Sequence, residues 1–145
     1  MGLLKEYDPK DVVITWDGVL LNEGIADGTF ITVTRNERTF ALSVGGDGGS
    51  TRVRNNNRSG LVTVTLRMGS ETNAQLSDKV KDEESGTPHV APLLVQDFSG
   101  NTLHSSEQAF LDGFPDDSMG TEEGTREWTL LCPILSMDPR GSLEA

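Results

Sequence analysis

Residues 60–68 carry the most regular pattern in the chain. The segment reads GLVTVTLRM, in which apolar and mostly hydroxyl-bearing side chains alternate one by one. Side chains of a β-strand point alternately to its two faces, so this period of two predicts a strand with one buried face. At about 3.4 Å per residue such a strand extends for roughly 30 Å. It needs partner strands, and the sixteen glycines and the turn dipeptides elsewhere in the chain predict them.

Turn residues divide the rest of the chain into short strands. The first hairpin joins residues 12–16 to 19–21 across Asp17 and Gly18, a pair suited to the positive φ angles of a two-residue turn. The other expected strands are 29–35 paired with 38–44 across Asn36 and Glu37, then 51–54, 91–98 paired with 101–111, and 125–135. The fold is therefore expected to be mainly β.

One segment departs from the strand pattern. Residues 71–81 follow Ser70, a suitable N-cap, and place Ala74, Leu76 and Val80 on one thin apolar stripe. We therefore expect a single short helix at 71–81. An acidic, glycine-containing loop is expected at 112–124, and the 145 residues fit one domain, residues 1–145.

Alternation sorts the strand residues onto two faces. The apolar face, which we expect to form the core, consists of Ile31, Val33, Phe40, Leu42, Val44, Val62, Val64, Leu66, Met68, Trp128, Leu130 and Cys132. The opposite face is small, rich in hydroxyl groups and nearly free of lysine. Its candidates for the lining of a lumen are Thr32, Thr34, Ala41, Ser43, Thr63, Thr65 and Thr129. Two interpretations remain open: an ordinary solvated face, since threonine has high β-propensity, or a channel wall closed by neighbouring subunits.

The chain is strongly acidic. Twelve lysines and arginines against 23 aspartates and glutamates give a formal charge of −11. Nucleic-acid affinity rests largely on cations that neutralise phosphates, so this charge argues against a protein that grips DNA, though not against one that DNA passes. The single cysteine, Cys132, excludes an intramolecular disulfide. The sequence lacks a signal-peptide pattern and a membrane-spanning run, and a soluble, cytosolic protein is expected.

No residue pattern indicates catalysis. Both histidines lie far from the cysteine in sequence, and the motifs of serine hydrolases, phosphate loops and zinc proteases are missing. Residues 45–50, GGDGGS, have the glycines of a phosphate loop without its lysine, and we interpret them as a flexible inter-strand loop. The carboxylates within 78–84 and 112–123 lack EF-hand spacing and are interpreted as solvated surface. We expect no catalytic residue, no metal and no cofactor.

Arg52, Arg54 and Arg58 form the one local cationic cluster in the sequence. Because a guanidinium group bonds carboxylates bidentately, arginines in so acidic a chain suit ion pairs across a subunit interface. Scattered surface arginines are an equally open interpretation, and a phosphate-binding role is the third.

Four colinear runs carry a family resemblance. They are residues 7–37, 51–66 (TRVRNNNRSGLVTVTL), 91–103 (APLLVQDFSGNTL) and 124–135 (GTREWTLLCPIL). Together they resemble the tail tube proteins of contractile-tailed bacteriophages and related prophages. The resemblance implies two packed antiparallel β-sheets, in a sandwich or barrel-like tail-tube fold, with one short flanking α-helix. It also implies hexameric rings whose inner strands close into one β-barrel and which stack into a tube.

The same resemblance implies a location and partners. It predicts a virion component, present in the host cytoplasm before assembly, that forms the channel for DNA ejection. The expected partners are further copies of the chain, the tail sheath protein, and the tape measure protein and DNA inside the lumen without tight binding, with no membrane. The residues leave one alternative open, a monomeric β-sandwich module that binds a ligand such as carbohydrate or calcium through loops 45–50 and 112–124.

Overall fold

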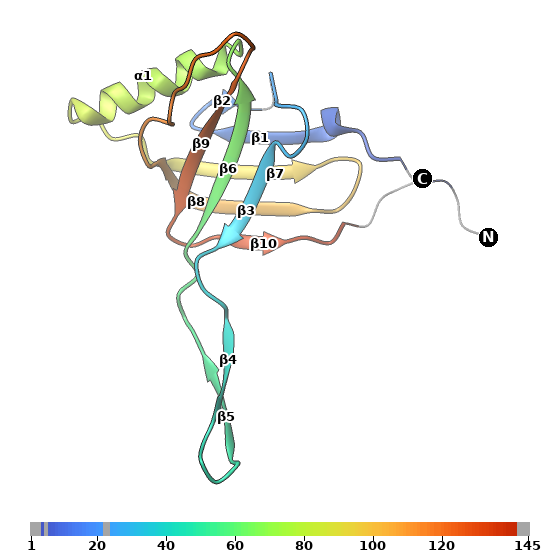
Figure 1. Ribbon diagram of the computed structural model, residues 1–145. Coiled ribbons are helices and arrows are strands. Elements are labelled where there is room, and N and C mark those ends of the chain that lie inside the picture. Colours follow the sequence, from blue (N-terminus) through green and yellow to red (C-terminus); the bar gives the residue numbers. More distant parts are fainter. Residues whose placement is uncertain (1–3, 5, 22–23, 142–145) are drawn as a thin grey trace.

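The computed structural model describes residues 4, 6–21 and 24–141 (Figure 1). A 3₁₀ turn at Pro9–Asp11 precedes the first strand. The strands are β1 (Val12–Trp16), β2 (Val19–Leu20), β3 (Ile31–Arg35), β4 (Phe40–Val44), β5 (Ser50–Arg54), β6 (Gly60–Arg67), β7 (Ala91–Asp97), β8 (Leu103–Leu111), β9 (Thr125–Cys132) and β10 (Ser136–Asp138). Helix α1 (Thr72–Glu84) lies between β6 and β7 in the chain.

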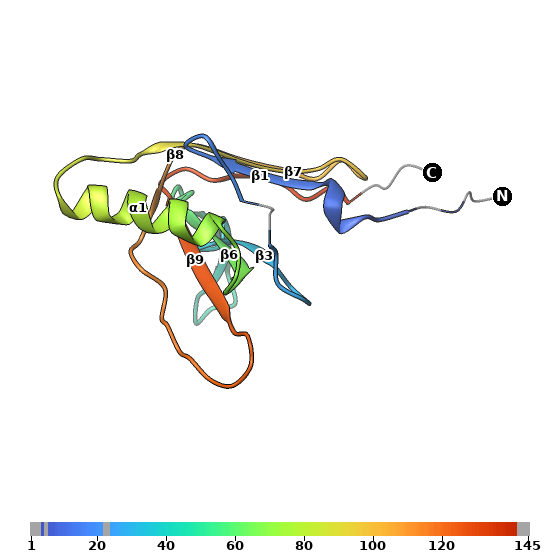
Figure 2. The ribbon, with the colours of Figure 1, turned by 90° about the horizontal axis from the view of Figure 1, so that it is seen from above.

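The strands of the body form two antiparallel layers that cross one another. The first layer has the order β2-β1-β7-β8, with β10 on the outer side of β8, and the second has the order β9-β6-β3. Strand β8 joins the two, because its residues Leu103–Ser105 pair with β10 while Phe110 and Leu111 pair with β9. Figure 2 shows the first layer nearly edge-on with the second running across it. The predicted class of two antiparallel sheets with one helix is confirmed, and the sheets do not close into a barrel.

The core fills the space between the layers and beneath α1. All three predicted core residues of β6 and all three of β9 are buried: Val62, Val64, Leu66, Trp128, Leu130 and Cys132. Ile31 and Val33 of β3 are partly buried against the same cluster. The first layer contributes Trp16, whose Nε1 donates to the carbonyl of Ala109 at 2.9 Å. A buried indole thus keeps its hydrogen bond, which burial in an apolar core requires.

Two hairpins agree closely with the sequence analysis, and the helix forms where it was expected. Glu71 rather than Ser70 occupies the N-cap position, although Ser70 Oγ accepts from Thr72 N at 3.3 Å, and Ala74 of the expected apolar stripe is exposed. Asp17 and Gly18 have φ angles of 49° and 76° in the β1–β2 turn, as the two-residue turn requires. Strands β7 and β8 pair as expected. Helix α1 buries Leu76 and Val80 but continues to Glu84 rather than ending at residue 81. Charged residues with good helix propensity extend it, and Gly86, with a φ of 100°, follows the end of the helix. Within the described part of the chain, no helix is both long and apolar enough to cross a membrane.

The expected hairpin between residues 29–35 and 38–44 is wrong. Strand β3 pairs with β6, and β4 pairs with β5, so the chain runs straight through residues 36–39 instead of turning there. The predicted core positions Phe40, Leu42 and Val44 are consequently exposed, with fractions of 43%, 72% and 62%. Their alternation is that of a strand whose apolar face is not covered by the described part of the body.

Candidate assembly surfaces

A two-stranded arm projects from the body. We define the arm as residues 38–58, which contain β4 and β5 and end in the 45–50 loop (Figure 1). Every residue of both strands is exposed. At the tip, Gly45 N donates to the Gly49 carbonyl and Gly49 N donates to Asp47 Oδ1, so the loop is an ordered turn. An isolated two-stranded ribbon is marginally stable in water, which makes this arm a surface in need of a partner.

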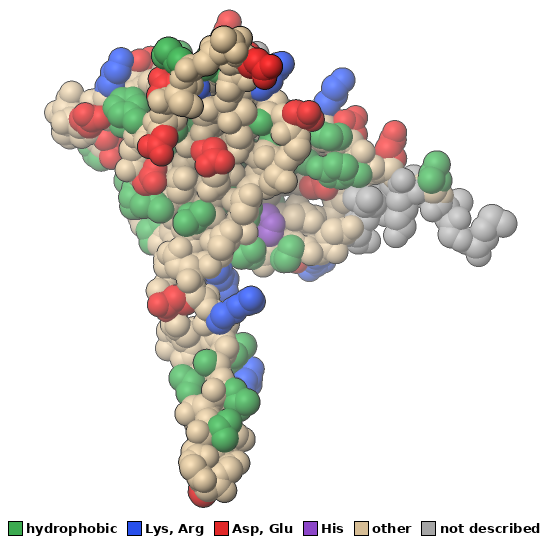
Figure 3. Space-filling model, in the orientation of Figure 1, with side chains coloured by type: hydrophobic (Ala, Val, Ile, Leu, Met, Phe, Trp, Pro, Cys, Tyr) green, Lys and Arg blue, Asp and Glu red, His purple; other side chains and the backbone are tan. Residues whose placement is uncertain are grey.

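One face of the arm combines apolar and cationic side chains. Directly paired residues of antiparallel strands point to the same side, and Phe40 pairs with Arg54 while Leu42 pairs with Arg52. The guanidinium carbon of Arg52 lies 3.8 Å from the centre of the Phe40 ring, and that of Arg54 lies 5.5 Å from it. These are cation–π contacts. We call Phe40, Leu42, Val44, Arg52 and Arg54 the arm face, and Figure 3 shows hydrophobic and basic groups along the arm.

The arginine cluster predicted from the sequence is divided by the fold. Arg52 and Arg54 stand together on the arm face, whereas Arg58 lies beyond β5 in the segment that returns to the body. None of the three forms an ion pair with another described residue. Their guanidinium groups are therefore available to carboxylates of another molecule.

The strand ladder is interrupted at the joint between arm and body. Asn36 N donates to the Ser59 carbonyl at 3.0 Å and Asn55 N donates to the Thr39 carbonyl at 2.7 Å, and side chains add further bonds. Asn36 Nδ2 donates to Ser59 Oγ at 2.9 Å, and Glu37 accepts from the side-chain amides of Asn55 and Asn57. Gly60, the first residue of β6, packs closely against Leu135 and Thr34. A Cβ there would lie 2.6 Å from the carbonyl oxygen of Thr34.

The candidate lumen residues fall into two groups. Thr32, Thr63 and Thr129 form one cross-strand row on the side of β3, β6 and β9 that faces away from the core. Thr34 and Thr65 extend this face, and we call these five residues the threonine face. It carries one acidic and one basic neighbour, Glu127 and Arg67, on the same side of β9 and β6. Ala41 and Ser43, in contrast, lie on the arm, opposite Val53 and Thr51.

The sheet that carries the threonine face has free edges on both sides. Among the described residues, strand β3 pairs only with β6, and β9 pairs with β8 only through Leu130 and Leu131. Residues Thr125–Trp128 of β9 therefore present backbone groups without a further partner strand in the described chain. Beside the β3 edge are hollows of 680 and 520 Å³, both lined by Val33 and Met137. Free edges recruit another strand unless they are covered.

The acidic loop of residues 112–124 combines carboxylates with exposed apolar side chains. It has no lysine or arginine and contains five aspartates and glutamates, and its Phe114 and Met119 are 50% and 81% exposed. Asp117 pairs with Arg126 of β9 at 2.7 Å, which fixes the loop to the body. Asp116 and Glu122 make no ion pair with any described residue. The sequence marked this loop as acidic, but its exposed apolar residues were not recognised as part of a surface.

A second polar cluster ties α1 to the β1–β2 turn. His89 Nδ1 lies 2.9 Å from Asp17 Oδ2 and its Nε2 lies 3.0 Å from Asp82 Oδ2, while Lys79 Nζ lies 2.8 Å from Asp17 Oδ2. Both ring nitrogens donate together only in the protonated imidazole. The hydrogen bond to Asp82 raises the pKa of His89, and Asp17 adds to this against the opposing effects of burial and Lys79. Burial tends to raise the pKa of Asp17, but the bonds from Lys79 and His89 lower it overall.

We expect this cluster to make stability depend on pH. The pKa of His89 in the folded protein lies above its ordinary value of 6.5. The stabilisation that protonated His89 gives the folded state is therefore complete below pH 6.5, and it is lost as the pH rises through the folded-state pKa. Urea unfolding of the wild type and of His89→Gln should therefore differ more at about pH 6 than at about pH 8. A difference that is equal at both pH values would contradict the assignment. Burial lowers the pKa of His104, which titrates in the opposite sense and is common to both proteins.

Other titratable groups give no sign of a reactive site. Burial raises the pKa of the Cys132 thiol, which makes it a poor nucleophile. Across residues 4, 6–21 and 24–141, no three His, Cys, Asp or Glu side chains are placed to hold a metal ion. The geometry thus offers surfaces for association rather than a pocket for chemistry.

Comparison of the sequence with known protein families identifies the kind of protein that carries these surfaces. Residues 14–138 match the family described as the Bacteriophage PhiTE tail tube protein. The chain belongs to this phage tail tube family. The match covers both layers, the arm and the helix, so it concerns the whole fold rather than a motif.

Two further similarities agree with the family. The tail tube protein is 29% identical over 136 residues to Structural protein ORF10 of Pseudomonas phage KPP10, covering 89% of this chain and 79% of that protein. Its fold resembles the anti-feeding prophage cap, described as a tube terminating cap, with a TM-score of 0.56 at 10% identity over 96% of this chain and 95% of the other. The second likeness shows the fold alone.

Membership of this family settles the broad class of function. The protein is a structural component of a phage tail, a part of the virion that assembles with itself into a tube, and not an enzyme. The family favours this role over the monomeric binding module that the residues left open.

Proposed function

We propose that six copies of the tail tube protein close into a ring, and that stacked rings form the channel through which DNA leaves a contractile-tailed phage. In each ring the β9-β6-β3 sheets join edge to edge into one large barrel. The threonine face lines the lumen. The subunit waits in the host cytoplasm before assembly and becomes part of the virion.

The observation that carries this proposal is the pair of free edges on the sheet with the threonine face. The free edge of β3 on one copy and residues Thr125–Trp128 of β9 on the next can supply the missing strand ladder. Ring closure then leaves no exposed edge, as in any closed barrel. The hollows beside β3, lined by Val33 and Met137, give the neighbouring copy apolar contact next to the backbone pairing.

The chemistry of the threonine face suits the passage of DNA. Small neutral side chains offer no cations to displace phosphate counterions, so DNA meets little attraction along the wall. The charges of Glu127 and Arg67, which lie next to this face, are opposite and cancel. The chain's charge of −11 adds a weak repulsion that keeps the duplex from adhering.

The remaining partners follow from the position of the ring in a tail. The threonine face meets the tape measure protein before DNA release and the DNA during it, in both cases without tight binding. The opposite surface of the body, on the outer side of β1, β7 and β8, is left for the tail sheath protein.

Association of the purified protein tests the proposal. Sedimentation velocity across a concentration series, with negative-stain electron microscopy of the concentrated samples, should show rings or tubes that grow with concentration. A strictly monodisperse monomer at every concentration and salt condition is the result that the proposal does not survive.

A further inference from the structure

We propose that the arm face of one copy docks on the acidic loop of a second copy, stacked head to tail along the direction of the arm. The occupant of the arm face is thus another molecule of this chain. The inference rests on the proposed function, because it names the contact by which one ring would meet the next.

The arm face has the composition of an interface that lacks its partner. Phe40, Leu42 and Val44 are large, apolar and exposed side by side on one strand. The guanidinium groups of Arg52 and Arg54 contact the Phe40 ring, so they are held next to the apolar side chains of this strand. Aromatic and arginine side chains are enriched in the cores of protein interfaces.

The acidic loop offers the complementary composition. Its exposed Phe114 and Met119 supply apolar surface, and the exposed Glu122 and Glu123 supply carboxylates without an ion-pair partner in the described chain. The Asp117–Arg126 ion pair anchors the loop, so it is held as a docking platform. The arm face thus combines apolar side chains with cations, and the acidic loop combines apolar side chains with anions.

The arm and the rest of the molecule carry net charges of opposite sign. Residues 38–58 carry four arginines and one aspartate, a charge of +3, which leaves −14 on the remainder of a chain whose total is −11. Opposite charges on two separate surfaces favour and orient their association.

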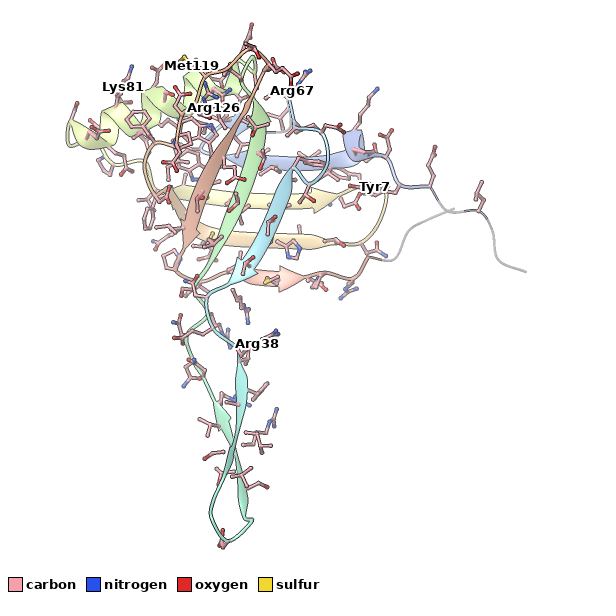
Figure 4. The ribbon with its side chains drawn as sticks, in the orientation of Figure 1. Tyr7, Arg38, Arg67, Lys81, Met119 and Arg126 are labelled. Atoms are coloured by element: carbon pink, nitrogen blue, oxygen red, sulfur yellow. The ribbon has the colours of Figure 1, made fainter. Side chains whose placement is uncertain are left out.

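The two surfaces lie at opposite ends of one molecule, so they cannot meet within it. The arm extends from one end of the body, and the acidic loop reaches the other end (Figure 1). In Figure 4, Met119 lies at the end opposite the arm, while Arg38 lies at the arm's root. A contact between different surfaces on two copies is open-ended, and repeating it generates a stack.

A charge swap tests the contact directly. We expect Arg52→Glu with Arg54→Glu to raise the critical concentration for assembly by about tenfold or more, because arm and loop then repel. Glu122→Arg with Glu123→Arg should do the same from the other side. A chain with all four substitutions restores complementary charge and should again assemble near the wild-type concentration. The readout is pelleting of assemblies across a protein concentration series.

Controls separate this contact from folding and from net charge. Lys10→Glu with Arg140→Glu changes the charge by the same amount as the two arm substitutions, at exposed positions just before β1 and just after β10, and should leave assembly unchanged. Thermal melting should show all variants folded. If the wild type assembles and the arm variant assembles equally well, or if the four-substitution chain gains nothing, the docking contact is wrong while the proposed function stands. A wild type that never assembles overturns both.

Discussion

Gly60→Ala should destabilise the body by about 1–3 kcal/mol, the cost of forcing an extra group into a packed site. The added Cβ would lie 2.5 Å from Leu135 Cδ2 and 2.6 Å from the carbonyl oxygen of Thr34. Leu135 can turn aside, but the Thr34 carbonyl belongs to β3, which pairs with β6 at this point. Strands β3 and β6 must therefore separate, which also loosens the root of the arm. Thermal unfolding should show a melting temperature lower by about 3–10 °C.

The arm supplies a matched control for this substitution. Gly46 lies in the loop at the arm tip, where a Cβ meets nothing within 4 Å. Gly46→Ala should leave the melting temperature unchanged or raise it slightly, since alanine restricts the unfolded chain more than glycine does. Equal melting temperatures for the two variants would show that the contact at Gly60 is not tight.

Thr63→Lys combined with Thr65→Lys should leave the subunit folded and reduce phage infectivity by about tenfold or more. Both positions lie on the threonine face of β6, where the side chains are half-buried and point away from the core, so a long lysine side chain can extend into solvent. In a ring of six copies the double variant adds about twelve cations to the proposed lumen, each able to hold a phosphate as DNA passes. The measurement is a plaque assay with particle counts, which separates failed assembly from failed ejection.

A control variant carries the same added charge elsewhere. Ser85→Lys with Thr87→Lys places two lysines in the exposed segment after α1, where basic side chains near a helix end are tolerated. This variant should infect normally. Normal infectivity of the Thr63 and Thr65 variant as well would show that the threonine face does not line the channel.

Local pattern was enough to predict the elements whose partners lie within the chain. Residues 60–68 could be predicted as a strand because β6 lies between β3 and β9 and buries one of its faces, which requires apolar residues at every second position. Asp17 and Gly18 could be predicted as a turn because both residues tolerate positive φ angles. The helix was shorter in the prediction because the apolar stripe ends at Val80. The acidic residues that follow carry no apolar stripe, and contacts invisible in the local pattern hold them: Asp82 and Glu83 both bond to His89.

The arm could not be predicted by the same reasoning. Alternation in residues 40–44 indicates an apolar face but says nothing about which molecule covers it, and an intramolecular core was the simpler interpretation. One sign was available in NNNRSG, residues 55–60, since such a polar stretch between two strands suits a joint. Likewise, the proximity of the arginines in sequence did not reveal that Arg52 and Arg54 share the Phe40 ring while Arg58 stands apart.

The central claim is that copies of this chain form a ring whose inner wall is the threonine face. A cryo-EM map of tubes assembled from the purified protein tests it most directly. We predict six copies in each ring, with β3 of one copy beside β9 of the next and the row of Thr32, Thr63 and Thr129 pointing into the lumen. A map in which the outer side of β1, β7 and β8 lines the channel, or in which β3 keeps a free edge, would contradict the account.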